Sequence, residues 1–198
     1  TQGTVAATMN GTAVTSGGEI AYDKPAVLKI TAKSGYVLGK LTVDNQVVNL
    51  PEGTFDATTK VTTYAAYTTA NLKTAMSINV EFTAKKTVSV SASPLSATRD
   101  EIAADKNLPT VTFTPSISGQ KYQFKNASGT LMDKLPATDG VYTIVATSPE
   151  TADYAALTDE SNKFTISQAN KLSWSVEGEQ GTVTAKMGDK DVANGGDI

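Results

Sequence analysis

The chain has 198 residues, a formal net charge of −3, and neither cysteine nor histidine. These absences exclude disulfides, zinc–thiolate sites and every mechanism that needs a thiolate or an imidazole, so we expect no enzyme, cofactor or transition metal. Of the 17 lysines and arginines only Arg99 is an arginine, and the acidic balance argues against nucleic acid as a partner.

Short runs of alternating apolar and polar residues follow one another along the chain, each bounded by turn-forming residues. This pattern is typical of antiparallel β domains. Strands are predicted over residues 5–9, 28–32, 41–43, 76–82, 88–92, 111–113, 122–124, 142–146, 164–166, 172–176 and 183–187. We therefore predict an all-β, mainly antiparallel fold. No apolar stretch of about 18 residues is present, so no membrane insertion is expected.

Turn and cap residues refine this outline. Asn10-Gly11 between two strands predicts a type I′ hairpin, because both positions tolerate positive φ. A polar loop is predicted over 49–60. Thr98 followed three residues later by Glu101 predicts a capping box at the start of a short helical segment within 100–107.

The two ends of the sequence match each other without a gap. Residues 3–20 read GTVAATMNGTAVTSGGEI and residues 181–198 read GTVTAKMGDKDVANGGDI, at an offset of 178, with nine of 18 positions identical. We therefore expect an excerpt of a longer protein that repeats a unit of about this length. Polar junctions predict a first domain over 1–84, a second over 85–169, and the start of a second copy of the first over 170–198.

The first domain resembles the divergent internalin B-type repeat of bacterial surface proteins. The resemblance rests on Gly3-Thr4-Val5, the turn ending in Gly17-Gly18, the strand at 27–32, Ser34-Gly35-Tyr36, and the strand at 77–82. Leu41 stands where that family often carries Trp, and the stretch 49–75 is longer. The resemblance implies a small, grasp-like β domain.

The second domain resembles bacterial Ig-like modules. Its best segment runs from Asp139-Gly140-Val141-Tyr142 to Ala146, followed by Tyr154 and by Phe164-Thr165-Ile166. An Asp-Gly-x-Tyr sequence before a strand is similar to the tyrosine corner of Ig-type sandwiches. Ile144 stands where an antibody domain has its second cysteine. The resemblance implies a β-sandwich with an apolar core in place of the disulfide.

Several residue groups suggest sites, and each has a simpler interpretation. Carboxylates at nearby positions suggest a calcium site formed by Asp189, Asp191 and Asp197. The first copy of the repeat has Gly11, Ala13 and Glu19 at the equivalent positions, which favours a solvated hairpin. Asp100, Glu101 and Asp105 suit a charged surface turn. Lys86 and Asn162 suggest an isopeptide cross-link, yet no signature motif surrounds them, and charged strand edges are preferred.

Aromatic residues gather in the first domain, where exposed rings could stack on sugars. Tyr36 and some of the others are expected to be core residues. Tyr64 and Tyr67 lie three apart and point to opposite faces of a strand, so one of them is expected to be exposed. The five are Tyr22, Tyr36, Phe55, Tyr64 and Tyr67.

The sequence thus favours a structural or adhesive segment of a long, repetitive bacterial protein at the cell surface or outside the cell. The alternative is a module that binds carbohydrate or a host protein. The strand at Leu172, Trp174 and Val176 precedes the second copy, whereas the first copy begins at Thr1. We expect this strand to be donated to the first domain of a neighbouring copy, with head-to-tail assembly as the result.

Overall fold

The structure is a computed structural model that describes residues 1–168, 171–172, 185–187, 190–192 and 196–197. The chain divides into two compact units. Unit 1 comprises Thr1–Ser89, Thr114–Gln120 and Thr147–Thr158, and unit 2 comprises Val90–Phe113, Lys121–Ala146 and Asp159–Ile198. The segments 114–120 and 147–158, which the sequence analysis placed in the second domain, therefore cluster with unit 1.

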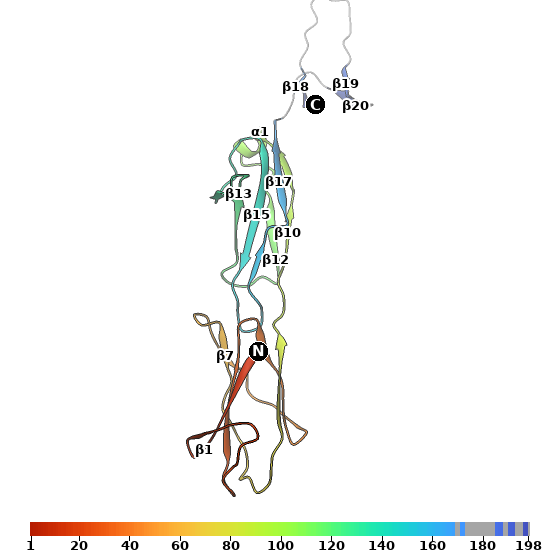
Figure 1. Cartoon of the computed structure of the whole chain (residues 1–198). Coiled ribbons are helices and arrows are strands. Elements are labelled where there is room, and N and C mark those ends of the chain that lie inside the picture. The colour runs from red at the N-terminus through yellow and green to blue at the C-terminus, as the bar shows by residue number, and fades with distance from the viewer. Residues whose placement is uncertain (169–170, 173–184, 188–189, 193–195, 198) are drawn as a thin grey trace, which may run out of the picture. The chain divides into compact units, whose positions relative to one another are not determined.

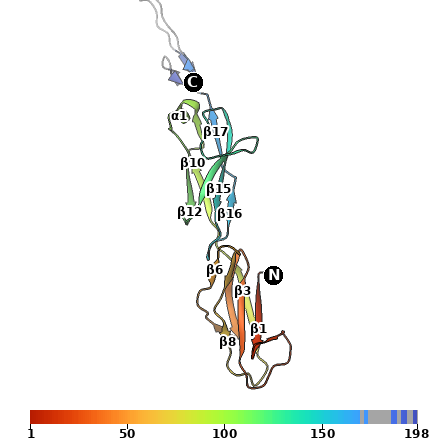
Figure 2. The same ribbon diagram turned by 90° about the vertical axis from the view of Figure 1, so that its left-hand side faces the viewer.

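Unit 1 contains two antiparallel sheets (Figure 1 and Figure 2). The larger has the order β2-β1-β3-β7-β6, with β8 also paired to β3, and the smaller has the order β5-β4-β9. Their bounds are β1 (Gly3–Met9), β2 (Thr12–Val14), β3 (Ala26–Ala32), β4 (Tyr36–Val43), β5 (Gln46–Val48), β6 (Thr54–Asp56), β7 (Val61–Thr63), β8 (Tyr67–Thr68) and β9 (Ile78–Ala84).

The core of unit 1 lies between these sheets. Alternate residues of β3 are buried, and Ile30 and Ala32 are fully enclosed. They pack in one cluster with Leu41 and Val43 of β4, which belongs to the other sheet. Burying such side chains gives roughly 1.5–3 kcal/mol each, so this sandwich-like layer holds the unit together.

The predicted hairpin after β1 is confirmed. Asn10 and Gly11 have φ of 50° and 78°, and Met9 pairs with Thr12 across the two-residue turn. The predicted loop over 49–60 is wrong in part, because β6 lies inside it. Phe55 is the only large apolar side chain of β6, so three residues offered too little alternation to show a strand.

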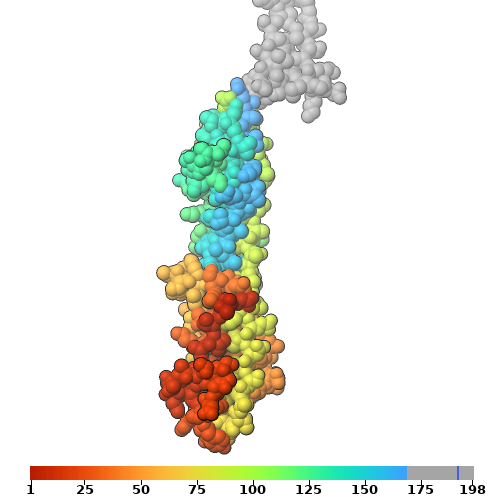
Figure 3. All heavy atoms as spheres, in the orientation of Figure 1, coloured from red at the N-terminus to blue at the C-terminus, as the bar shows by residue number. Residues whose placement is uncertain are grey.

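Most residues of the following strands belong to unit 2: β10 (Ser89–Ser93), β11 (Ser96–Thr98), β12 (Thr110–Thr114), β13 (Lys121–Lys125), β14 (Leu131–Met132), β15 (Gly140–Ser148) and β17 (Lys163–Ser167). Of β16 (Leu157–Asp159), Leu157 and Thr158 belong to unit 1. β10 pairs with β12, and the main sheet has the order β11-β17-β15-β13-β14, with β16 on β15. β11 runs parallel to β17. Figure 3 shows the outer surface of the chain with all heavy atoms as spheres, from red at the N-terminus to blue.

Eight buried residues make the core cluster of unit 2. Ile144 is one of them and is 1% exposed. The eight are Ala97, Ile102, Phe124, Leu135, Tyr142, Ile144, Phe164 and Ile166.

The all-β prediction is confirmed, since α1 (Arg99–Ala103) is the only helix among the residues that the structure describes. The capping box is also confirmed. The Glu101 N–H donates to Thr98 Oγ1 at 3.3 Å, and the Thr98 N–H donates to Glu101 Oε2 at 2.7 Å. The helix ends earlier than the predicted segment, at Ala103. No helix in the described part of the chain could cross a membrane.

Candidate functional site

The repeated sequence folds with the same register in both copies. In the first copy Ala7 pairs with Val14, and Met9 with Thr12. In the second copy β19 (Ala185–Met187) pairs with β20 (Lys190–Val192) so that Ala185 lies opposite Val192 and Met187 opposite Lys190. Every one of these positions is displaced by the offset of 178 residues. The sequence similarity therefore extends to backbone pairing.

The segment predicted to be a strand donor is described only at its start. β18 (Lys171–Leu172) pairs antiparallel with β21 (Gly196–Asp197), and Leu172 lies opposite Gly196. Trp174 and Val176, the other two predicted donor residues, lie outside the described residues.

A buried ion pair stands out in unit 1. Lys85 Nζ lies 2.8 Å from Glu150 Oε1, and the two side chains are 0% and 3% exposed. The Gly35 N–H and the Ser34 hydroxyl also donate to the Glu150 carboxylate, at 2.7 and 2.6 Å. Lys85 Nζ donates further to the Thr151 carbonyl at 2.6 Å. These bonds tie the loop 149–156, between β15 and β16, to the turn after β3 and to the end of β9.

The surroundings favour the charged form of the Glu150 carboxylate. Burial alone would raise the pKa of the Glu150 carboxyl, but hydrogen bonds from Gly35, Lys85 and Ser34 outweigh it and lower the pKa. On the other side, Lys85 Nζ lies 4.1 Å from the centre of the Phe55 ring, a distance that suits a cation–π interaction. A buried, hydrogen-bonded ion pair of this kind holds backbone segments in place and is suited to a structural role.

The residues proposed for an isopeptide cross-link have other roles. Lys86 lies in unit 1 with Nζ 5.8 Å from the centre of the Tyr154 ring. Asn162 belongs to unit 2, where its carbonyl accepts a hydrogen bond from the Ile144 N–H. Each residue therefore takes part in the packing or pairing of its own unit.

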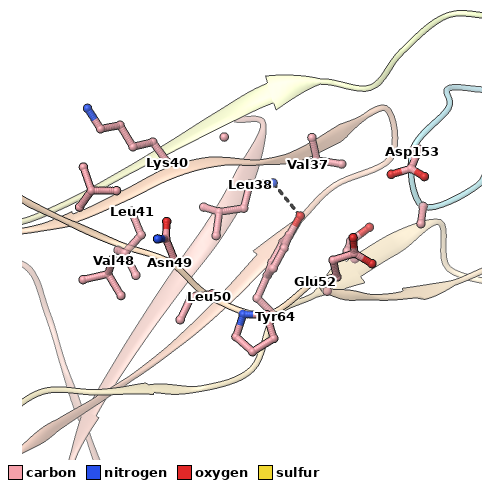
Figure 4. Close-up of a pocket in the computed structure, with 16 residues that line it drawn as sticks. Val37, Leu38, Lys40, Leu41, Val48, Asn49, Leu50, Glu52, Tyr64 and Asp153 are labelled. Carbon is pink, nitrogen blue, oxygen red and sulfur yellow. Dashed lines mark hydrogen bonds between the residues drawn. The ribbon is translucent and has the colours of Figure 1, made fainter.

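A pocket of about 380 Å³ lies beside β4, β5 and the chain that leads into β6 (Figure 4). Leu38, Val48 and Leu50 form apolar parts of its wall, while Glu52 and Asp153 bring carboxylates to it. The ring of Tyr64 also lines it, and the Tyr64 hydroxyl accepts a hydrogen bond from the Leu38 N–H at 2.7 Å. The pocket thus combines aliphatic walls with carboxylates and a phenol.

Thr62 is a further lining residue that the sequence did not single out. Its hydroxyl is buried and has no hydrogen-bond partner among the described residues. Only the folded structure reveals this, because nothing in the sequence distinguishes Thr62 from 29 other threonines.

The five aromatic side chains of the first domain do not form an exposed platform. Tyr22 is 72% exposed, whereas Tyr64 is buried. Tyr36, Phe55 and Tyr67 are half-buried. Tyr36 and Tyr67 pack against the core cluster that contains Tyr64, which confirms that Tyr36 and some of the others are core residues. The prediction that one of Tyr64 and Tyr67 is exposed is wrong, because neither is.

The acidic groups do not gather into a metal site in the part of the chain that is described. Asp191 is exposed at a hairpin position, Asp189 lies outside the described residues, and Glu101 serves as the helix cap.

Comparisons of the chain with protein-family models, with curated proteins and with solved structures found no match. A functional interpretation therefore depends on the residues and on the geometry given above.

Proposed function

We propose that the chain is a structural or adhesive segment of a long, repetitive bacterial extracellular protein, a stalk or adhesin spacer at the cell surface. The observation that carries this proposal is the 18-residue repeat at an offset of 178 residues, whose hairpins share one register. Repetition of whole folded units is what a spacer needs, since its length is set by their number.

The likeness to two kinds of surface-protein module supports the same proposal. For the internalin B-type repeat, it rests on the sequence pattern of unit 1. For the Ig-like module, it gains support from Tyr142, whose hydroxyl donates to the Thr138 carbonyl at 3.1 Å, four residues upstream. A tyrosine corner has this geometry.

The proposed work of the segment is spacing and resistance to pulling. Full-length chain tethered at both ends in single-molecule force spectroscopy should unfold in discrete steps, because each unit has its own core. A Glu150→Gln variant should lower the force of one step and leave the other unchanged, since the ion pair belongs to unit 1. Extension without a force peak, like that of a disordered chain, would contradict the spacer proposal.

Head-to-tail assembly by strand complementation is the second part of the proposal. Residues Leu172, Trp174 and Val176 are the proposed donor strand, and the first unit of another chain is the acceptor. Because the contact joins unlike surfaces, it builds open chains of molecules unless the rotation closes a ring. Light scattering should show a mass that grows with concentration, and a constant monomer mass would contradict this part alone.

The pocket favours one alternative, a module that binds carbohydrate or a host protein. Its carboxylates and its aliphatic wall are the groups that orient a sugar ring. A glycan array probed with the wild type and with a Glu52→Gln/Asp153→Asn double variant tests whether the pocket binds a sugar. Binding that the double variant loses would support the alternative, while no binding by either protein would exclude a sugar of the array as its ligand.

A further inference from the structure

We propose that the pocket of unit 1 binds a primary ammonium group on an aliphatic stem, as the lysine side chain of a partner protein carries it. This inference rests on the alternative given above, in which the pocket is a binding site, and it names the chemistry of the ligand. Every residue that lines the pocket belongs to unit 1, so this unit alone supplies the site.

Two carboxylates at the pocket have no positive partner. Glu52 and Asp153 are exposed, and their side chains make no hydrogen bond or ion pair with any residue that the structure describes. They differ in this from Glu150 of the same unit, which Lys85 neutralises at 2.8 Å. The field of the two unpaired carboxylates is negative and favours a cation as the occupant of the pocket.

The lysine in the pocket wall leaves this negative charge in place. Lys40 lies on β4 directly opposite Glu81 of β9 in the antiparallel register, so its charge faces a glutamate of the same sheet. Figure 4 shows the Lys40 side chain extending away from Glu52 and Asp153, which lie toward the opposite side of the view. The acidic part of the pocket is therefore open to an ammonium group from a partner.

The rest of the wall suits a hydrocarbon stem. Leu38, Val48 and Leu50 line it with aliphatic groups, and the pocket volume of about 380 Å³ lies within the range of ligand pockets. Lysine lays its methylene stem along apolar surface and keeps its charged end at polar groups. An amino sugar also carries an ammonium group, but its ring hydroxyls would lose water against this wall without gaining partners. The wall therefore favours a lysine stem over a sugar ring.

A buried hydroxyl at the same pocket lacks a partner. Thr62 lines the pocket and is 3% exposed, and no described residue makes a hydrogen bond to its Oγ1. Folded proteins satisfy the large majority of their buried polar side-chain atoms, so an exception in a pocket wall points to a group that arrives with a ligand. An ammonium group has only donors, and it matches a wall that offers two carboxylates and a hydroxyl oxygen as acceptors.

Titration of the isotope-labelled, full-length chain with two small probes tests the proposal by nuclear magnetic resonance. One probe is Nα-acetyl-lysine methylamide, and the other is Nα-acetyl-norleucine methylamide, which keeps an aliphatic stem without the ammonium group. The amide signals of Gly39 and Gly53 report on the pocket, which both residues line. The lysine probe should bind at least about fivefold more tightly than the norleucine probe, the scale for two partly exposed ion pairs. Added salt should weaken the binding of the lysine probe alone.

Two double variants locate the binding. Glu52→Gln/Asp153→Asn should bind the lysine probe about fivefold more weakly than the wild type and should lose the preference over norleucine. The matched control is Glu19→Gln/Asp23→Asn, which removes two exposed carboxylates of unit 1 that do not line the pocket. This control should bind the lysine probe as the wild type does.

Equal losses in the two double variants would reflect net charge alone and would overturn the site. Equal binding of the two probes, or no saturable shift of Gly39 and Gly53 with the lysine probe, would overturn the ammonium assignment. If methyl glucoside shifts these two signals and the lysine probe does not, the pocket is still a binding site and only the ligand class is wrong. The spacer proposal is decided by force spectroscopy and does not depend on any of these results.

Discussion

Lys85 Nζ and Glu150 Oε1 lie 2.8 Å apart in unit 1, on side chains that are separated by 65 residues and almost completely withdrawn from water. Lys85 follows β9, and Glu150 belongs to the loop 149–156 between β15 and β16. The pair therefore fixes a distant loop to the first β-sandwich. Its strength depends on both partners, because a single charge at this site would be buried without compensation.

Replacing Glu150 by glutamine should lower the free energy of unfolding of unit 1 by about 3 kcal/mol, the scale for a buried charge that loses its partner. The single amide oxygen of glutamine can still accept from the Gly35 N–H, while its amide nitrogen can only donate toward Ser34 Oγ, and the side chain does not neutralise Lys85. The matched control is Glu160→Gln, which removes the partly exposed ion pair with Lys125. The Glu160→Gln change should lower the free energy of unfolding by less than about 1 kcal/mol. Urea denaturation followed by circular dichroism measures both, and equal losses would contradict the structural role of the buried pair.

The same carboxylate should make stability depend on pH. The pKa of Glu150 is lowered in the folded state, so between the folded and unfolded pKa values the unfolded chain binds the proton and the folded chain does not. The contribution of the Glu150 carboxylate to the free energy of unfolding is complete at pH values above the ordinary carboxyl pKa. It is lost as the pH falls through the lowered pKa of the folded state. Denaturation of the wild type and of Glu150→Gln between pH 7 and acid should therefore show a difference that shrinks on acidification. A difference that stays constant with pH would count against this assignment.

Local sequence signals predicted local features well. The Asn10-Gly11 hairpin and the Thr98–Glu101 capping box depend on residues within three positions of each other, and both are present. Lys85 and Glu150, by contrast, meet only after the chain has folded. Nothing near Glu150 in the sequence distinguishes it from a surface glutamate, and the alternation that predicts strands carries no information about which loop packs on which sheet.

The pocket shows the same limit. Leu38, Val48 and Leu50 read as ordinary strand residues, and Thr62 as one polar residue in a stretch rich in threonine. They converge because β4, β5 and the chain before β6 are brought together by the two sheets. Long-range pairing of this kind is set by the whole core and not by any one segment.

The capping box gives a prediction for unit 2. Thr98→Ala should lower the free energy of unfolding of this unit by about 1 kcal/mol, because the Glu101 N–H at the start of α1 loses its acceptor. Thr98→Ser keeps the hydroxyl and should restore most of the stability. Thermal denaturation of the three proteins measures the effect. If Thr98→Ser were no more stable than Thr98→Ala, the loss of stability would come from the missing methyl group and not from the missing cap hydrogen bond.

Two buried threonines of unit 1 give the last prediction, since they differ in one respect. Thr69 Oγ1 accepts from the Ala26 N–H at 2.9 Å and donates to the Ala70 carbonyl at 2.8 Å, whereas Thr62 Oγ1 has no partner among the residues described. Valine has nearly the shape of threonine without the hydroxyl.

Thr62→Val should therefore raise the free energy of unfolding by about 1 kcal/mol, because it removes a buried polar group that makes no hydrogen bond. Thr69→Val should lower it by about 1–3 kcal/mol, since the buried Ala26 N–H loses its acceptor. Urea denaturation of both variants beside the wild type gives the two signs directly. A loss of stability in Thr62→Val would mean that its hydroxyl is satisfied in solution by a buried water, which needs polar partners and room of its own at that site. The pocket that Thr62 lines would then be hydrated at this wall, and a ligand bound there would have to displace that water.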